Sequence, residues 1–339
     1  MPGARSANRV LIPPRLAPFR PDPLLSHAHD LAGQTMGTTW SVRLAGPAVM
    51  PLDALRAGVQ RELDGVVARM SHWRADSDLG RFNDAPAGQW RTLAPDFFEV
   101  LACAQQVAAQ SDGAFDATVG ALVDAWGFGP RGHRDALPTA DEVAALQAAC
   151  GWRRLMLDHD GLRALQPGGL RLDFSGIAKG YGVDRVAALL QRCGVPGWLV
   201  EVGGELRGHG IKPDGQPWWT ALETPPDAPG DLPLTVVALH GLAVATSGDY
   251  RQRFEHDGRR YAHTLDPRSG CPLHDAPASV TVLHPRCMLA DAYATALTVL
   301  GVARGLDFAQ QYDLAARFLS RTAQGLEEHY SPAYAAMLE

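Results

Sequence analysis

The most informative stretch of this 339-residue chain is Asp173-Phe174-Ser175-Gly176-Ile177-Ala178-Lys179-Gly180. It joins a predicted strand, which contains Leu170 and Leu172, through a Ser-Gly turn to a helix predicted over 177–193. The N–H groups at a helix start are unpaired and carry partial positive charge, so they favour phosphate. Lys179 opposes the helix dipole there, which is costly unless an anion lies nearby. The stretch predicts either a phosphate-binding turn or a solvated lysine beside a helix cap.

The segments on both sides of this turn predict an α+β fold. Before the turn, Thr38, Trp40, Val42 and Leu44 alternate with polar neighbours, as in a half-buried strand. Helical patterns lie within 51–73, 95–110 and 139–150, and later ones over 289–300 and around 302–320. Short strand-like runs lie within 155–165, 197–202, 234–239, 242–247 and 279–284. We expect mixed, mainly antiparallel sheets with helices packed to one side.

The domain organisation follows from the same patterns. Residues 1–30 are rich in proline and show no periodicity, so we expect an irregular N-terminal tail. Residues 31–330 are expected to form a single domain, with an N-terminal helical part that extends to about residue 150.

Composition and charge exclude several classes of protein. With 31 basic and 37 acidic side chains the net charge is −6, and no basic cluster is present, so we expect no nucleic-acid partner. The five cysteines are far apart and form no CxxC pair, which is typical of a reducing compartment. The basic, proline-broken N-terminus has no apolar core of a secretory signal. As written, the sequence therefore predicts a cytoplasmic location.

A second candidate site lies on the predicted helix 289–300. Asp291 and Thr295 are four residues apart in a segment of small and apolar residues, so they share one helix face. A carboxylate and a hydroxyl are the hard oxygen ligands that Mg²⁺ prefers, with substrate phosphates and water completing the octahedron. The alternative is structural, with Asp291 capping the helix and Thr295 bonding back to a carbonyl.

Three further segments carry residues suited to chemistry or to ligand binding. His263 follows a predicted strand and precedes the Asp266-Pro267 turn, where a histidine among acids and hydroxyls suits proton transfer. Aromatic residues among glycines, at 113–129, and Trp73 in a polar loop have rings that stack on a planar heterocycle or pack in the core.

These segments occur in a characteristic order along the chain. From about residue 33 to residue 300 the order is TMGTTW, MSHWRADSDLGRFN, GAFDATVGALVDAWGFG, LDFSGIAKGYGVDRV, GGELRGHG, ATSGDYRQRF, HTLDPRSGCPL and ADAYATAL. The set resembles the ApbE family, the FAD:protein FMN transferases, over most of the chain. The resemblance implies an ApbE-like, T-fold-related α+β domain.

The resemblance also implies an activity and the residues that serve it. The family binds FAD and Mg²⁺ and transfers the FMN moiety to a threonine hydroxyl of an acceptor protein through a phosphoester, with release of AMP. By similarity, Mg²⁺ is held by Asp291, Thr295 and the main-chain carbonyl of Gly176. FAD is held by Met36, Trp73, Ala114, Phe115, Asp116, Asp173, Lys179 and His263, and His263 is also the catalytic residue that assists deprotonation of the acceptor threonine. Together these roles place the Asp291–Thr295 helix opposite the start of the Lys179 helix, across the pyrophosphate.

The resemblance also implies the kind of partner. The acceptor is a protein with an Asp-(Gly/Ser)-(Ala/Ser)-Thr motif, such as a redox-complex subunit or a flavoreductase. The oligomeric state stays open, with a homodimer among the alternatives. An FAD pyrophosphatase, in which water replaces the threonine, and a non-catalytic flavin-binding protein are the competing functions.

The largest departure from the family pattern is the missing export signal or lipobox, since many relatives are periplasmic and tethered to the membrane, and it leaves the location open between the cytoplasm and the periplasm. The chain also departs from the pattern at three positions. Trp73 replaces a tyrosine, which keeps a stacking face but changes hydroxyl bonding, and Ser269 replaces a threonine. Glu201 stands where the family has asparagine, two residues before the Gly-Gly pair. Because an added anion near phosphate opposes FAD binding, we expect Glu201 to point elsewhere or to pair with Arg207.

Overall fold

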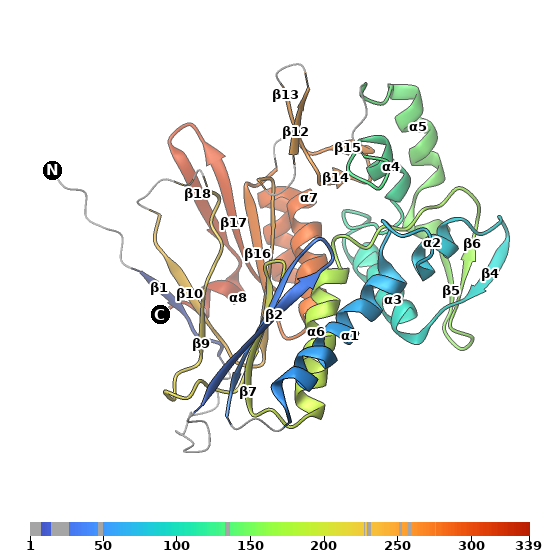
Figure 1. The fold of residues 1–339 in the computed structure, drawn as a ribbon. Coiled ribbons are helices and arrows are strands. Elements are labelled where there is room, and N and C mark those ends of the chain that lie inside the picture. The colour runs from blue at the N-terminus through green and yellow to red at the C-terminus, as the bar shows by residue number, and fades with distance from the viewer. Residues whose placement is uncertain are drawn as a thin grey trace.

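A computed structural model of the chain describes residues 8–14, 27–46, 50–132, 136–226, 228, 232–250, 253–256, 259–274 and 276–339. Its largest element is an eight-stranded sheet with the order β18-β17-β16-β11-β8-β7-β3-β2 (Figure 1). All neighbouring strands in this sheet are antiparallel. The strands are β2 (Ala28–Thr35), β3 (Thr38–Ala45), β7 (Gly197–Val202), β8 (Glu205–His209), β11 (Leu242–Gly248), β16 (Ser279–His284), β17 (Ala315–Thr322) and β18 (Gly325–Tyr330).

Three long helices cover one face of this sheet (Figure 1). They are α1 (Leu52–Met70), α6 (Ala178–Arg192) and α7 (Cys287–Gln311). Trp40 and Val42 of β3 pack with α1 and α6, and Val280 of β16 packs with α7. Because alternate side chains of a strand point to the same face, these positions line the helix-covered face of the sheet in two buried clusters, one under α1 and α6 and one under α7.

The opposite face of the sheet is covered by a second, smaller sheet, β1-β10-β9 (Figure 1). It consists of β1 (Arg9–Leu11), β10 (Thr235–Leu239) and β9 (Trp218–Ala221), and a short helix, α8 (Pro332–Ala335), packs beside it. Leu11, Val237 and Tyr334 are fully buried in this layer. The fold is therefore α+β with mainly antiparallel sheets and with its long helices on one side, which confirms the predicted fold class.

A further group of elements lies beyond α6 and α7, away from the small sheet (Figure 1). The helices are α2 (Asp78–Asn83), α3 (Pro95–Gln110), α4 (Gly120–Ala125), α5 (Ala140–Ala149) and the 3-10 turn Trp152–Arg154. The strands are β4 (Gln89–Thr92), β5 (Met156–Asp158), β6 (Arg163–Gln166) and the hairpins β12 (Arg253–His256)–β13 (Arg259–Ala262) and β14 (Leu265–Asp266)–β15 (Cys271–Pro272). Thr139 and Glu142 form the expected capping box of α5.

The prediction that residues 1–30 are irregular is wrong for two segments. Residues 9–11 form β1, which pairs in parallel with β10, and β2 begins at Ala28. Leu11 is 0% exposed, and the Arg9 guanidinium pairs with Glu328 of β18. A three-residue strand has too little periodicity to detect, and its partner lies more than 200 residues away. The other residues of the predicted tail, 1–7 and 15–26, lie outside the described residues.

Two element boundaries also differ from the prediction. The division expected between helices at 289–300 and around 302–320 is present, because α7 is broken at Gly301, whose φ is +72°, but the end of the second helix differs. The second part ends at Gln311 because the chain turns at Asp313 with a φ of +51° and continues as β17. Residues 315–319 are all buried, and such a short apolar run does not distinguish helix from strand. The strand expected at Leu170 and Leu172 is reduced to a single bridge at Arg171.

Among the described residues, α7 alone is long and apolar enough to cross a membrane by length and composition. However, 61% of its most apolar window is buried inside the fold, where it packs against α6, β11 and β16. We therefore interpret α7 as the central core helix of this domain.

The role of β1 predicts a large effect of a single truncation. Leu11→Ala should lower the free energy of unfolding by about 2–5 kcal/mol, because it leaves a cavity between the two sheets. Chemical denaturation measures this difference. The matched control is Leu234→Ala, just before β10, whose side chain is 47% exposed and whose loss should change the free energy by about 0.5 kcal/mol or less. Equal effects of the two variants would contradict the burial of β1.

Candidate functional site at the crossing of α6 and α7

The turn before α6 is built around the Asp173 side chain. Its Oδ1 accepts hydrogen bonds from the Ser175 N–H at 2.7 Å and from the Ser175 hydroxyl at 2.5 Å. The main-chain N–H of Asp173 donates to the carbonyl of Ala117 at 2.8 Å, so the turn is attached to the loop before α4. Asp173 is 8% exposed. The carboxylate thus shapes the turn that leads into α6.

The start of α6 and the first half of α7 lie in direct contact. The Gly180 N–H in the first turn of α6 donates to Oδ2 of Asp291 at 3.0 Å. A Cβ at Gly180 would lie 2.4 Å from the carbonyl oxygen of Cys287 and 2.9 Å from the Asp291 Cβ. Only glycine fits such a close helix crossing. The two segments therefore face each other, as the sequence analysis expects, and Asp291 is 4% exposed at their contact.

Thr295 lies one turn further along α7, beside the Ser175–Gly176 turn. A Cβ at Gly176 would be 2.9 Å from Thr295 Oγ1 and 3.4 Å from the ring of Phe115. The hydroxyl of Ser247, on β11, lies 3.4 Å from the same Thr295 oxygen. The turn before α6 and helix α7, which are far apart in sequence, thus bring Gly176 beside Thr295, one helical turn from Asp291.

This donor set suits a hard divalent cation. It offers a carboxylate, a hydroxyl and a main-chain carbonyl, all of them oxygen, and one carboxylate oxygen of Asp291 already accepts from Gly180. Within the part of the chain that the structure describes, no group of three or more His, Cys, Asp or Glu residues forms a metal site. A cation held here thus has one carboxylate ligand and takes others from phosphate and water, as Mg²⁺ does.

The anion beside Lys179 is a protein carboxylate. The Lys179 ammonium pairs with Glu205 at the start of β8, and Glu205 is only 1% exposed. The Lys179 side chain passes the Gly203-Gly204 turn, where a Cβ at Gly203 would be 3.3 Å from Lys179 Cδ. The lysine is therefore held in place at the helix start, and it is not the freely solvated side chain of the alternative interpretation.

Glu201 faces its own turn and not a basic side chain. Its Oε1 accepts from the Gly204 N–H at 2.8 Å, and its Oε2 lies 3.4 Å from the Ser41 hydroxyl. Arg207, the expected partner of Glu201, instead pairs with Asp184 of α6 at 2.6 Å. Of the two alternatives expected for Glu201, the structure therefore shows the first, a side chain that points elsewhere, and not a pair with Arg207, which β8 directs towards α6.

Two residues of the predicted flavin set lie around this crossing. Met36 occupies the two-residue β2–β3 loop with a φ of +49°, and its methyl group would lie 3.1 Å from a Cβ at Gly182 of α6. Trp73 is 61% exposed, and its ring lies 5.3 Å from that of His72. His72 Nδ1 is 3.6 Å from Oδ1 of Asp173. Sequence reasoning did not identify His72, although it directly precedes the tryptophan.

The Ala114–Asp116 segment is buried beside the crossing, and Asp116 serves its own loop. Its carboxylate accepts from the N–H and hydroxyl of Thr118 at 2.8 and 2.7 Å and from the Trp152 N–H at 2.9 Å. Burial raises the pKa of Asp116, against the effect of these hydrogen bonds. Both carboxylate oxygens of Asp116 are therefore engaged within the protein.

His263 lies just after β13 and is half-buried. Its ring meets that of Phe128 edge-on at a centroid distance of 6.5 Å. The hairpin that follows packs on the helical part, where the indole N–H of Trp126 donates to the carbonyl of Gly270 at 2.8 Å. The packing of this hairpin therefore determines the position of His263. The catalytic role of His263 is a proposal.

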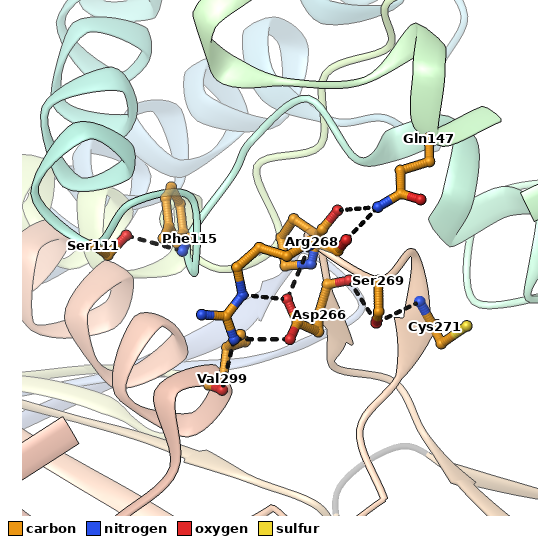
Figure 2. Close-up of polar contacts among 9 residues, drawn as sticks. Ser111, Phe115, Gln147, Asp266, Arg268, Ser269, Cys271 and Val299 are labelled. Carbon is orange, nitrogen blue, oxygen red and sulfur yellow. Dashed lines mark hydrogen bonds and ion pairs between the residues drawn. The ribbon is translucent and has the colours of Figure 1, made fainter. Parts of the chain in front are cut away.

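Hydrogen bonds of the Asp266–Gly270 turn connect that hairpin to α5 and α7 (Figure 2). Arg268 binds Asp266 in a bidentate manner at 2.8 Å and reaches the Val299 carbonyl at 3.5 Å. Burial opposes ionisation of Asp266, but the Arg268 hydrogen bonds prevail and lower its pKa. Gln147 of α5 donates to the Pro267 carbonyl at 3.4 Å and to that of Arg268. The DPRSG motif is therefore structural support beside the site.

Comparison with known proteins shows the family of the chain. The ApbE family model matches residues 36–318. The chain belongs to the ApbE family. It is 38% identical to the "FAD:protein FMN transferase" of Vibrio cholerae over 309 residues, which are 91% of this chain and 92% of that protein.

Solved structures of family members have the same fold. The apo form of the Pseudomonas stutzeri flavinyl transferase ApbE superimposes with a TM-score of 0.84 at 40% identity, over 92% of this chain and 96% of that chain. The flavin transferase ApbE from Vibrio cholerae gives 0.85 at 36% identity, over 92% and 99%. The family and the fold class predicted from the sequence are confirmed.

The close crossing predicts how the site responds to one added methyl group. Gly180→Ala should lower the free energy of unfolding by about 1–3 kcal/mol, because the new Cβ collides with the α7 backbone. The control is Gly65→Ala in α1, where a Cβ meets only the flexible end of Arg69 at 3.4 Å. That change should raise stability by up to about 1 kcal/mol, because alanine has the higher helix propensity. Urea unfolding that shows no loss for Gly180→Ala would contradict the crossing.

Proposed function

We propose that this chain is a Mg²⁺-dependent FAD:protein FMN transferase, which moves the FMN moiety of FAD onto a threonine hydroxyl of an acceptor protein and releases AMP. The observation that carries the proposal is the meeting of Asp291 and Thr295 with the Gly176–Gly180 turn of α6. Relatives that align over most of this chain bear the name of this activity. The acceptor is expected to present an Asp-(Gly/Ser)-(Ala/Ser)-Thr motif.

The reaction is a displacement at phosphorus. The threonine oxygen of the acceptor attacks the phosphorus on the FMN side of the FAD pyrophosphate, and a new O–P phosphoester bond forms. The bond between that same phosphorus and the bridging oxygen breaks, and AMP leaves with the bridging oxygen. The threonine proton is taken by a base, for which His263 is the candidate. Catalysis of this kind depends mainly on placement and on charge neutralisation.

The residues at the crossing suit those two tasks. Asp291, Thr295 and the Gly176 carbonyl would hold Mg²⁺, which when bound neutralises pyrophosphate charge. Lys179, at the start of α6, supplies a second positive charge. Its ammonium group is held in place by Glu205 of β8. The helix start itself favours phosphate through its partial positive charge.

The flavin and adenosine parts of FAD require flat, apolar surfaces. Trp73 is the exposed ring next to the Asp173 turn, and Met36 lies against α6 near Gly182. The Ala114–Asp116 main chain borders the same turn through Phe115. We propose that these residues hold the two ring systems, with Asp173 keeping the turn between them in shape.

Replacing the metal-binding carboxylate tests the proposal. Asp291→Asn retains an oxygen that accepts the Gly180 N–H, but it removes the negative charge, so the fold should persist. AMP release from FAD should fall by about 10²-fold or more, as expected for a loss of several kcal/mol of charge stabilisation. Chromatography of AMP, with circular dichroism for the fold, measures both. Wild-type turnover in this variant would mean that the metal site lies elsewhere.

The acceptor assay separates transfer from hydrolysis. Wild-type protein, FAD, Mg²⁺ and a candidate acceptor should give flavin fluorescence on the acceptor band of a denaturing gel, together with one AMP per flavin. Release of FMN and AMP without labelling, for every acceptor with the motif, would support a pyrophosphatase. FAD that stays intact would support a flavin-binding protein.

The role of His263 has its own test. His263→Ala should slow labelling of the acceptor by about 10²–10⁴-fold if the imidazole takes the threonine proton. FAD binding, measured by flavin fluorescence titration, should weaken by a smaller factor, because the other residues proposed to hold FAD remain in place. If labelling slows less than about threefold, His263 packs against Phe128 and is not a base.

A further inference from the structure

Helix α7 begins without a cap of its own. The residue before it, Arg286, makes no side-chain hydrogen bond to the helix start. Instead, Asp184 of α6 accepts the first two N–H groups of α7, from Cys287 to its Oδ1 and from Met288 to its Oδ2, each at 3.0 Å. Unpaired N–H groups at a buried helix start are costly, so this carboxylate supplies what the local sequence lacks.

Helix α6 is capped in the same way by α7. Its own N-cap residue, Ile177, makes no side-chain hydrogen bond to the helix start, and the Gly180 N–H donates to Asp291. Each helix therefore carries the acid that caps the other. The two carboxylates, Asp184 and Asp291, attach the helices at two points and fix how far α7 is displaced along α6.

Strand β8 contacts two side chains of α6, Lys179 and Asp184. Glu205 and Arg207 are two residues apart, so they point to the same face of the strand. Glu205 pairs with Lys179 and Arg207 pairs with Asp184 at 2.6 Å. Both partners are on α6, five residues apart. Strand β8 thus orients the side chains of both Asp184 and Lys179.

We propose that Asp184 is a positioning residue for the Asp291–Thr295 metal site, and this inference rests on the proposed function. Asp291 lies about one helical turn after the N–H groups that Asp184 accepts, so it moves with them. Without the hydrogen bonds to Asp184, α7 is free to shift relative to the Gly176 turn. Thr295 of α7 and the Gly176 carbonyl must both reach the same ion, so such a shift weakens the metal site. Asp184 does not touch the ion, and it acts through the start of α7.

The test compares Asp184→Asn and Asp184→Ala with the wild-type protein. The amide of the asparagine variant accepts one of the two N–H groups, and the alanine variant accepts neither. Mn²⁺ is titrated into full-length protein with saturating FAD, and free Mn²⁺ is measured by electron paramagnetic resonance, with FAD alone as the blank. Affinity should fall by about 10–100-fold for alanine, as for other residues that orient metal ligands, and by less for asparagine.

A matched variant separates positioning from general loss of stability. Ser331→Ala removes another buried cap, which accepts the Tyr334 N–H of α8 on the opposite face of the sheet. It should lower the melting temperature yet leave Mn²⁺ affinity unchanged. If both Asp184 variants also keep wild-type affinity, the proposal is wrong and Asp184 is structural only. If the wild-type protein with FAD binds no Mn²⁺, the proposed function fails first, and this inference fails with it.

Discussion

One hydrogen bond organises the site, the bond from the Gly180 N–H of α6 to the Asp291 carboxylate of α7. The bond forms because the two helices cross closely. A methyl group at Gly180 would collide with the α7 backbone. The same crossing places Thr295 beside Gly176. An acid and a hydroxyl thus lie beside the Gly176 turn at the positive end of α6, where the helix dipole favours a phosphate and the Asp291 carboxylate favours a cation.

The sheets determine where this crossing stands. The long antiparallel sheet presents one apolar face to α1, α6 and α7, and the small sheet and α8 cover the other. β8 lies near its middle and reaches α6 through Glu205 and Arg207, while β11 reaches α7 through Ser247. The contacts that pack the core therefore also determine the geometry of the site.

Local patterns in the sequence predicted what depends on nearby residues. The spacing of Asp291 and Thr295 set their shared helix face, and Thr139 marked the start of α5. Long-range pairing escaped prediction, as with β1, whose partner strand is over 200 residues away, and with Arg207, which pairs with Asp184 and not with Glu201. The run at 315–319 was ambiguous because a fully buried strand shows no alternation. The spacing alone suggested Asp291 and Thr295 as metal ligands, the Gly176 carbonyl came from the family resemblance, and the structure shows how the two segments meet.

The central claim is that one divalent ion binds where Asp291, Thr295 and Gly176 meet. Anomalous diffraction from crystals grown with FAD and Mn²⁺ tests it most directly. The account predicts a single strong peak within about 2.0–2.5 Å of an Asp291 carboxylate oxygen, the Thr295 hydroxyl and a pyrophosphate oxygen. A peak bound by other residues, with Asp291 contacting only Gly180, would contradict it.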